Sequence, residues 1–198
     1  MSESQSAKER RAKQTLNNLL LSLAATAGLV VILVLAVPRP NTSLLQAVDY
    51  KSAAKEASSG SSLPILAPEL LGKGWYSNSA RWNSKTADGV SNWYVGFVGP
   101  KNQYLGLTQA FGSNQTWSLL QLKGDVPVGS VTMGGLKWVE WKSTTISDPP
   151  KTRDHAFVAD IKGNNRLDQL LIYGTATKTE FNRFATVVAA AQRSGYAK

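Results

Sequence analysis

The chain of 198 residues contains no cysteine and only one histidine, His155. Without cysteine it can form no disulfide, so its stability rests on packing, and it has no thiol to carry a lipid anchor. Most zinc chemistry is removed as well, because zinc sites are built largely from cysteine and histidine. Acidic residues are scarce, 13 against 22 lysines and arginines, which gives a formal net charge of +9. These absences predict a protein with no bound metal and no cofactor.

Charge is missing altogether from one long segment, Leu19–Val37, whose 19 residues are almost all apolar. As a helix this segment would rise about 28 Å, which matches the ~30 Å hydrocarbon core of a lipid bilayer. Four basic residues precede the segment, and Arg39 is the only one directly after it, an asymmetry that favours a cytoplasmic N-terminus. The sequence therefore predicts a single-pass anchor, held in the lipid bilayer of the cell membrane through Leu19–Val37.

Such an anchor divides the chain into parts on two sides of the membrane. We expect a basic cytoplasmic tail without regular structure at 1–18, the transmembrane helix at 19–37, a tether at 38–48 and an extracytoplasmic domain at 49–198. Of the net charge, +7 lies beyond the tail. That excess suits either a solvated surface or attraction to anionic lipid and acidic wall polymers. Nucleic acid is not expected as a partner, because the basic residues are scattered.

Two other interpretations of the apolar segment remain open. A cleaved signal peptide has the same basic and apolar layout, but cleavage after Ala27 would leave only a short apolar region before the cut. Cleavage after Val37 would place Pro38, a poor residue after a cut, first in the mature chain. A buried helix of a globular protein is the third interpretation, although nothing polar marks a solvent-facing side.

Three hairpins are predicted from apolar strands joined by turn-forming residues, after a first strand near 75–82. In the first hairpin a four-residue loop at 99–102 places Phe97 opposite Tyr104, with apolar side chains on both faces. In the second, a two-residue turn of glycines at 134–135 sets Met133 beside Leu136. The third joins 155–162 to 167–173 and is expected to be buried on one face only.

Two helices complete the expected domain. Asp49 is a suitable N-cap for a short helix over 50–57. Thr177 and Glu180 have the spacing of a capping box for a helix over 178–193, and Gly195 would end it. An apolar stripe on this last helix requires a sheet face to cover it. The expected fold class is α+β, a mostly antiparallel sheet of about six or seven strands packed by the C-terminal helix.

No catalytic motif is present in the sequence. A Gly-x-Ser-x-Gly elbow, a phosphate-binding glycine loop and the dinucleotide glycine pattern are all absent. His155 is interpreted as an ordinary residue at a strand end. Carboxylate pairs such as Glu140 with Asp160 or Asp168 can be assembled, but any domain with this many acidic residues offers such pairs. Asp168 beside Arg166 is better explained by turn chemistry.

Tryptophan is the unusual feature of the domain, because all six tryptophans lie beyond residue 74. Most are expected to fill the core between sheet and helix. The functional alternative is a groove for an apolar or carbohydrate ligand. Its candidate residues are Trp82, Trp117, Trp141, Arg81 and Lys142.

A set of short motifs runs through most of the chain. They are Arg39-Pro40, Val48-Asp49-Tyr50, Leu63-Pro64, Pro68, Gly74-Trp75, Trp93, Gly96, Pro100, Tyr104, Gly106-Leu107 and Gln109. With this set the chain resembles an actinobacterial family of membrane-anchored proteins catalogued as a domain of unknown function, number 4245. The resemblance implies an anchored extracytoplasmic domain and no particular reaction.

Two classes of function follow from these observations. The preferred one is a membrane-anchored, non-catalytic binding or scaffolding module of the cell envelope, which contacts anionic lipid, a wall polymer or an envelope protein. The alternative is a cell-envelope hydrolase with an unrecognised active site. That alternative predicts two carboxylates, or His155 and a hydroxyl group, converging in a pocket.

Overall fold

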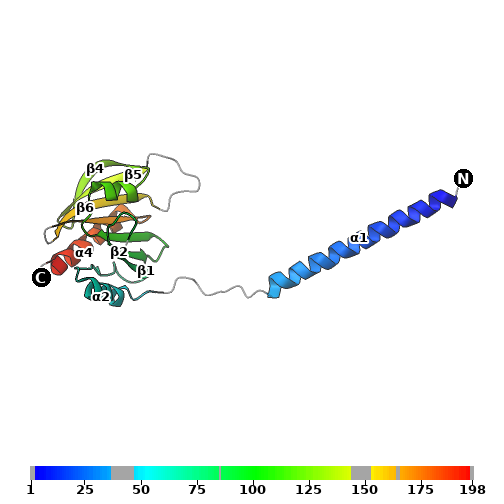
Figure 1. Ribbon diagram of the computed structural model, residues 1–198, viewed down its shortest axis with the longest axis horizontal. Coiled ribbons are helices and arrows are strands. Elements are labelled where there is room, and N and C mark those ends of the chain that lie inside the picture. The colour runs from blue at the N-terminus through cyan, green and yellow to red at the C-terminus, as the bar shows by residue number, and fades with distance from the viewer. Residues whose placement is uncertain (1–2, 37–46, 85, 144–152, 164–165, 197–198) are drawn as a thin grey trace. The chain divides into compact units, whose positions relative to one another are not determined.

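The computed structural model describes residues 3–36, 47–84, 86–143, 153–163 and 166–196, and divides the chain into two units, Met1–Leu44 and Leu45–Lys198 (Figure 1). The first unit contains helix α1 (Glu3–Ala36). The second contains three helices and seven strands in its described part. These are α2 (Tyr50–Ser61), β1 (Tyr76–Asn83), β2 (Asn92–Val98), β3 (Tyr104–Ala110), α3 (Gln115–Gln121), β4 (Asp125–Met133), β5 (Leu136–Ser143), β6 (His155–Gly163), β7 (Arg166–Gly174) and α4 (Lys178–Tyr196).

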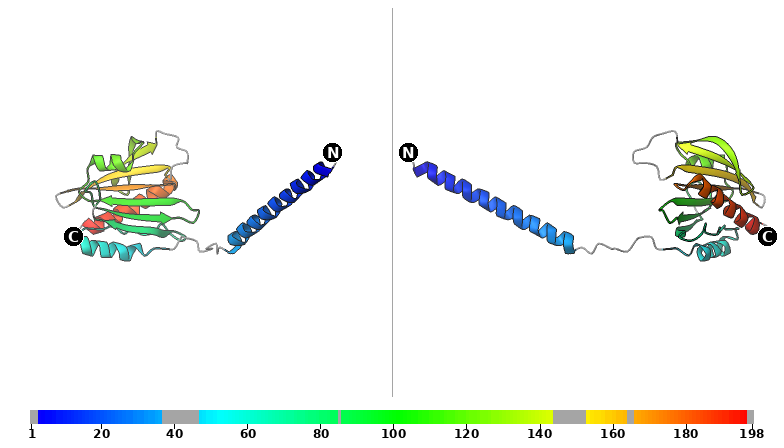
Figure 2. Two further views of the ribbon diagram at one scale, coloured as in Figure 1. Left: turned by 45° about the vertical axis from the view of Figure 1, so that its right-hand side comes forward. Right: turned by 180° about the vertical axis from the view of Figure 1, so that it is seen from behind.

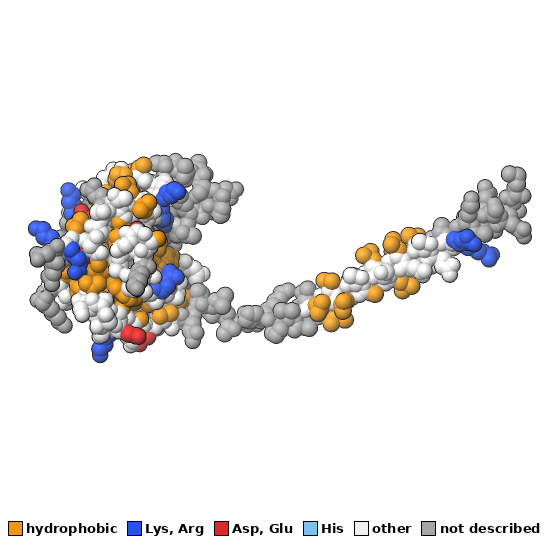
Figure 3. All heavy atoms as spheres, in the orientation of Figure 1, with side chains coloured by type: hydrophobic (Ala, Val, Ile, Leu, Met, Phe, Trp, Pro, Cys, Tyr) orange, Lys and Arg blue, Asp and Glu red, His pale blue; other side chains and the backbone are white. Residues whose placement is uncertain are grey.

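Helix α1 is the one described helix that is long and apolar enough to cross a membrane, over Lys13–Leu33. Its apolar side chains are exposed, with basic side chains towards its N-terminal end (Figure 3). The helix begins at Glu3, so the expectation of a tail without regular structure is wrong. Helical structure continues through the charged residues because alanine, lysine, arginine and glutamine are all good helix formers. Val37 and most of the expected tether lie outside the described residues.

The strands form one antiparallel sheet in the order β1-β2-β3-β7-β6-β5-β4, which confirms the α+β class and the strand number expected from sequence (Figure 2). The C-terminal strand β7 therefore lies in the middle of the sheet, between β3 and β6. One face packs against α2, α4 and the segment from Leu63 to Trp75. The other face is partly covered by α3. We call these the α4 face and the α3 face.

The α4 face holds the main core. Phe181, Phe184 and Val188 of α4 are at most 1% exposed and pack on the sheet, as their helical spacing predicts. The capping box is present, because the Glu180 carboxylate accepts from the backbone N–H of Thr177 at 2.9 Å. Partial burial acts to raise the pKa of Glu180, but hydrogen bonds from Thr177 and Gln103 outweigh it and lower the pKa. The helix runs on to Tyr196, so the expected end at Gly195 is wrong.

Helix α2 begins where the sequence predicts and ends later. The Asp49 side chain accepts a hydrogen bond from the Ser52 backbone N–H at 3.1 Å, which confirms it as the N-cap. The helix then continues through the serine-rich segment to Ser61 rather than stopping at Ala57. The Ser61 hydroxyl donates to the Ala57 carbonyl at 2.6 Å, so serine side chains pair with backbone groups of the last turn.

The first hairpin has a different register from the one expected. The Gly99 N–H donates to the Gln103 carbonyl at 2.8 Å, and Asn102 has a φ of 60°, which together define a three-residue loop. Val98 therefore pairs with Tyr104, and the expected pairing of Phe97 with Tyr104 is wrong by one residue. Because side chains alternate between faces, Tyr104 lies on the α3 face and Phe97 on the α4 face.

The other two hairpins keep the expected pairing. Met133 pairs with Leu136 across the glycine turn, and Gly134 and Gly135 have φ values of 61° and 84°, as a type I′ turn requires. In the third hairpin Phe157 faces the main core, as expected. Val158 is also buried, at 5% exposed, on the α3 face, so the expectation of burial on one face only is wrong. Both faces of this pair are covered, because α4 packs on one and α3 on the other.

Candidate functional site

A cavity of about 560 Å³ lies on the α3 face, between α3 and strands β4 to β7, and we call it the α3 cavity. Its apolar wall consists of Leu119, Pro127, Val139, Trp141 and Val158. Its polar groups are Ser118, Lys137, Asp160 and Gln169. An apolar wall with a few convergent polar groups is the usual composition of a small-molecule site, and the volume lies within the common range of about 300–1,000 Å³.

Among the described residues, the indole N–H groups of two buried tryptophans beside this cavity have no hydrogen-bond partner. Trp117 of α3 is 2% exposed and Trp141 of β5 is 8% exposed, and both belong to the small core under α3. A buried donor left without an acceptor costs about 1–3 kcal/mol. Trp141 also lines the cavity, so its indole would report on a molecule bound there.

The polar groups of the α3 cavity are held in defined orientations. The Gln169 amide donates to the Asp160 carboxylate at 2.7 Å, and its oxygen accepts from the Ser113 hydroxyl at 3.1 Å. Gln169 is 2% exposed, whereas Asp160 and Lys137 are exposed at the mouth. The two exposed groups carry opposite charges, so they favour a neutral or zwitterionic polar group over a strongly charged one.

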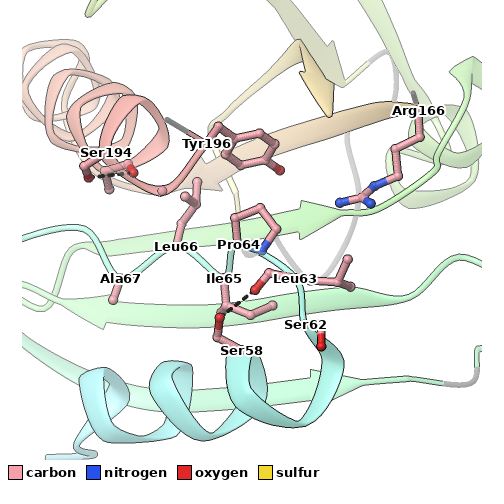
Figure 4. Close-up of a pocket in the computed structure, with 12 residues that line it drawn as sticks. Ser58, Ser62, Leu63, Pro64, Ile65, Leu66, Ala67, Arg166, Ser194 and Tyr196 are labelled. Carbon is pink, nitrogen blue, oxygen red and sulfur yellow. Dashed lines mark hydrogen bonds between the residues drawn. The ribbon is translucent and has the colours of Figure 1, made fainter. Parts of the chain in front are cut away.

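A larger cavity, of about 710 Å³, lies at the C-terminal ends of α2 and α4, where Ser58 and Tyr196 come from opposite walls (Figure 4). Behind it, the carboxylate of Asp168, whose side chain is fully buried, accepts from Arg166 Nε at 2.7 Å and from the Tyr196 hydroxyl at 2.8 Å. The Gly112 N–H also donates to Asp168, at 2.9 Å. Burial and the Asp168 carboxylate raise the pKa of Tyr196.

Gln109 extends this buried network to the wall of the larger cavity. Its amide donates to the Tyr196 hydroxyl at 3.0 Å and to the Pro64 carbonyl at 2.9 Å, and its oxygen accepts from the Leu66 N–H at 2.9 Å. These polar groups satisfy one another, so the network fixes the end of α4 against β3, β7 and the segment after α2. We interpret this cavity as a by-product of that structural network.

A cluster of three tyrosines, Tyr94, Tyr104 and Tyr173, lies on the α3 face over β2, β3 and β7. The hydroxyls of Tyr94 and Tyr104 form a short hydrogen bond above Gly96, and burial raises the pKa of Tyr104. Gly106 lies opposite Gly96, and a Cβ atom there would come within 2.9 Å of the Tyr173 ring. Glycine is therefore required at these positions by the rings that lie over them.

Of the residues proposed from sequence as a groove, Trp117 and Trp141 come together in the small core under α3, and the other three lie elsewhere. Arg81 and Trp82 lie on β1, and Trp141 and Lys142 lie on β5, with four strands between. Trp82 packs against the main core, and the Arg81 guanidinium lies 4.8 Å from the centre of the Tyr94 ring. Lys142 is exposed, 4.0 Å from Glu140. Of the five candidates, Trp141 alone is among the residues that line the α3 cavity.

The groups considered for a hydrolase are also apart. Asp160 lies on the α3 face, whereas Glu140 and Asp168 lie on the α4 face, and Asp168 is occupied by Arg166. His155 Nδ1 lies 4.0 Å from Glu140 Oε1, and within the described part of the chain neither atom has a hydrogen-bond partner. Lys178 Nζ lies 3.7 Å from the same carboxylate oxygen. No hydroxyl group of the described residues is hydrogen-bonded to His155 Nδ1.

The sequence arguments missed most of the α3 cavity. Val139, Val158 and Gln169 each lie on a strand whose other face supplies the main core. Along these strands they alternate with Trp138, Phe157 and Leu170, which face the main core. This alternation is the sequence signal that could have indicated a second buried face of the sheet. Helix α3, which closes the cavity, is only seven residues long and is marked by the cap Asn114, whose side chain accepts from the Trp117 N–H at 3.1 Å.

The described structure thus defines a class of protein, one with an apolar N-terminal helix and a separate antiparallel α+β unit. The chain belongs to the family described as "Protein of unknown function (DUF4245)", whose family model matches residues 11–188. The match confirms the family to which the sequence motifs pointed, domain of unknown function number 4245. No curated protein and no solved structure matches the chain.

Proposed function

We propose that this chain is a non-catalytic binding module of the cell envelope, anchored in the membrane by α1, with its second unit outside the cytoplasm. We further propose that the α3 cavity is its binding site and takes a small amphipathic molecule. The observation that carries this proposal is the composition of the cavity, where the buried Trp141 and two valines line an apolar wall and the exposed Asp160 and Lys137 lie at the mouth.

The chemistry of the cavity indicates the kind of ligand. Val139, Val158 and the Trp141 ring offer an apolar surface to a short hydrocarbon or sugar-ring face. Asp160 and Lys137 at the mouth can bind hydroxyl groups. A neutral molecule with an apolar part and a hydroxyl-rich part, such as an alkyl glycoside or a fragment of a glycolipid, has these properties.

Two further observations support the proposal. The apolar length of α1 and the basic residues before it favour an anchor with a cytoplasmic N-terminus. Lysine and arginine side chains are scattered over the face of the second unit in Figure 3, which fits a solvated surface better than a binding site for a polyanion. The separation of Glu140, Asp160 and Asp168 supports binding without hydrolysis.

The test uses the full chain in lipid nanodiscs, with ¹⁵N-labelled tryptophan and n-hexyl-β-D-glucoside as the probe. The indole N–H signal of Trp141, assigned by its loss in Trp141→Phe, should move saturably as the probe is added. Two variants on adjacent exposed residues of α3 provide the control, Leu119→Trp inside the cavity and Leu120→Trp outside its lining. The first should weaken binding about tenfold or more by filling the mouth. The second should leave binding unchanged.

Two outcomes would contradict the proposed function. The Trp141 signal could remain fixed while the probe is added to saturation of the lipid phase, or it could move equally in the Leu119→Trp and Leu120→Trp variants. Release of free glucose from the probe, abolished in Glu140→Gln, would support the hydrolase alternative instead.

A further inference from the structure

The two edges of the sheet differ in how they are protected. At β1, the Val48 N–H donates to the Ser77 carbonyl at 2.8 Å, α2 packs beside the strand, and Arg81 places a charge on it. At β4, every residue from Val126 to Thr132 is exposed and none is charged. Three of these residues are valines, 40–48% exposed. An exposed, uncharged, β-branched edge strand presents free backbone groups to another strand.

The turn geometry shows which backbone groups of β4 are free. In a two-residue hairpin the residues flanking the turn exchange both hydrogen bonds, so Met133 directs its N–H and C=O groups towards Leu136. The direction then alternates along the strand. Ser130 and Thr132 therefore direct their N–H and C=O groups outward, away from β5. The register shift between Pro127 and Gly129 ends the regular part of this edge.

We propose that β4 of one chain pairs in antiparallel fashion with β4 of a second copy, about a two-fold axis at Val131. In this arrangement Ser130 of each chain exchanges backbone hydrogen bonds with Thr132 of the other, which gives four in total. Val131 faces its own counterpart across the axis. The pairing joins the two seven-stranded sheets into one.

A second copy is the occupant that the edge fits best. The chain carries a net charge of +9, and β4 is a segment where two such chains can meet without apposing like charges. Since the β1 edge is covered, the pairing closes at two copies instead of extending into a fibre. This proposal draws on the anchor of the proposed function in one respect, because α1 would hold both copies in one membrane plane and raise their effective concentration. It does not depend on a ligand in the α3 cavity.

The axis at Val131 makes a distance prediction that a chain without cysteine is well suited to test. Two residues 131 would be a non-hydrogen-bonded pair with Cα atoms about 4.5 Å apart. A disulfide needs a Cα separation of about 4.4–6.8 Å. The two residues 132 would be diagonal neighbours, about 7–8 Å apart, and so beyond easy reach of a disulfide.

The experiment is mild oxidation of full-length single-cysteine variants in proteoliposomes, read on a non-reducing gel. Val131→Cys should shift to twice the monomer mass, whereas Thr132→Cys and the α2 control Ser59→Cys should remain monomeric. Adding Ser130→Pro to Val131→Cys removes one outward N–H on each chain without touching the β4–β5 ladder, and the shift should be lost. Val131 and Ser130 are exposed, so these changes leave the fold intact.

The proposal is overturned if Val131→Cys stays monomeric, or if Ser59→Cys crosslinks to the same extent. It is also overturned if crosslinking at Val131 survives Ser130→Pro, or if the crosslinked product contains a different protein. None of these readings requires the hexyl glucoside probe, so failure here leaves the binding test of the α3 cavity unaffected.

Discussion

The buried network around Asp168 allows one prediction with a worked magnitude. Tyr196→Phe removes a hydroxyl that donates to Asp168 and accepts from Gln109. Asp168 keeps its hydrogen bonds from Arg166 and Gly112, so the variant should lose about 1–2 kcal/mol of the free energy of unfolding. Asp168→Asn instead leaves the Arg166 guanidinium, 28% exposed, without its counter-charge, and should lose about 3–5 kcal/mol.

The assay is urea unfolding of the full chain in detergent, followed by tryptophan fluorescence. All six tryptophans lie between residues 75 and 141, so the signal reports the second unit and not α1. The double variant should lose less than the two single variants together, with a coupling of about 0.5–3 kcal/mol because they share one hydrogen bond. The reasoning fails if Tyr196→Phe costs as much as Asp168→Asn, or if the two losses simply add.

Three shorter predictions concern the fold. Gly174→Ala places a Cβ atom 1.9 Å from the Tyr104 carbonyl oxygen, at a residue whose φ is 153°. In the same urea assay the variant should lose at least about 3 kcal/mol of the free energy of unfolding. A loss under about 1 kcal/mol would contradict this prediction. The pKa of Glu180 is lowered in the folded state, so the stability that this residue contributes is present above its ordinary pKa of 4.5 and is lost as the pH falls through the lowered pKa. The free energy of unfolding of Glu180→Gln should therefore depend less on pH between pH 5 and about 2. An unchanged pH profile would refute this. Burial, with smaller effects from Glu69 and Asp49, raises the pKa of Tyr50 to about 12, so the stability that Tyr50 contributes is lost between about pH 10 and 12. Tyr50→Phe should reduce that loss of stability in a pH titration followed by fluorescence. Identical titration curves for the variant and the original chain would count against this.

Local patterns predicted the elements of this fold well. The glycine turn at 134–135 set the β4–β5 register correctly, because two adjacent glycines with positive φ leave one tight hairpin geometry. The predicted register of the first hairpin was wrong, because Asn102 also adopts a positive φ and shortens the loop to three residues. An asparagine can adopt either a negative or a positive φ, whereas a pair of adjacent glycines strongly favours the tight turn. The sequence alone therefore could not decide the register of the first hairpin.

The site was harder to predict than the fold, because its parts meet only through the strand order. Trp141 and Gln169 lie on β5 and β7, and nothing local places β6 between them. The tryptophan count suggested a groove, but it could not show that Trp82 faces the main core while Trp141 faces α3. Similarly, Arg166 and Asp168 were recognised as a local pair, yet their partners Gln109 and Tyr196 are distant in sequence.

The central place of β7 also constrains the order in which the second unit can be built. The hairpins β1–β2–β3 and β4–β5 can form as soon as their residues leave the ribosome, since their pairings are local. Until β6 and β7 follow, β3 and β5 each present an open edge, and the apolar stripe of α4 that covers the core has not been made. The nascent second unit therefore remains incomplete, with exposed strands open to mispairing, until β7 and α4 have been made. A truncation before Gly174 would remove the strand that joins the two halves of the sheet, and not a peripheral element.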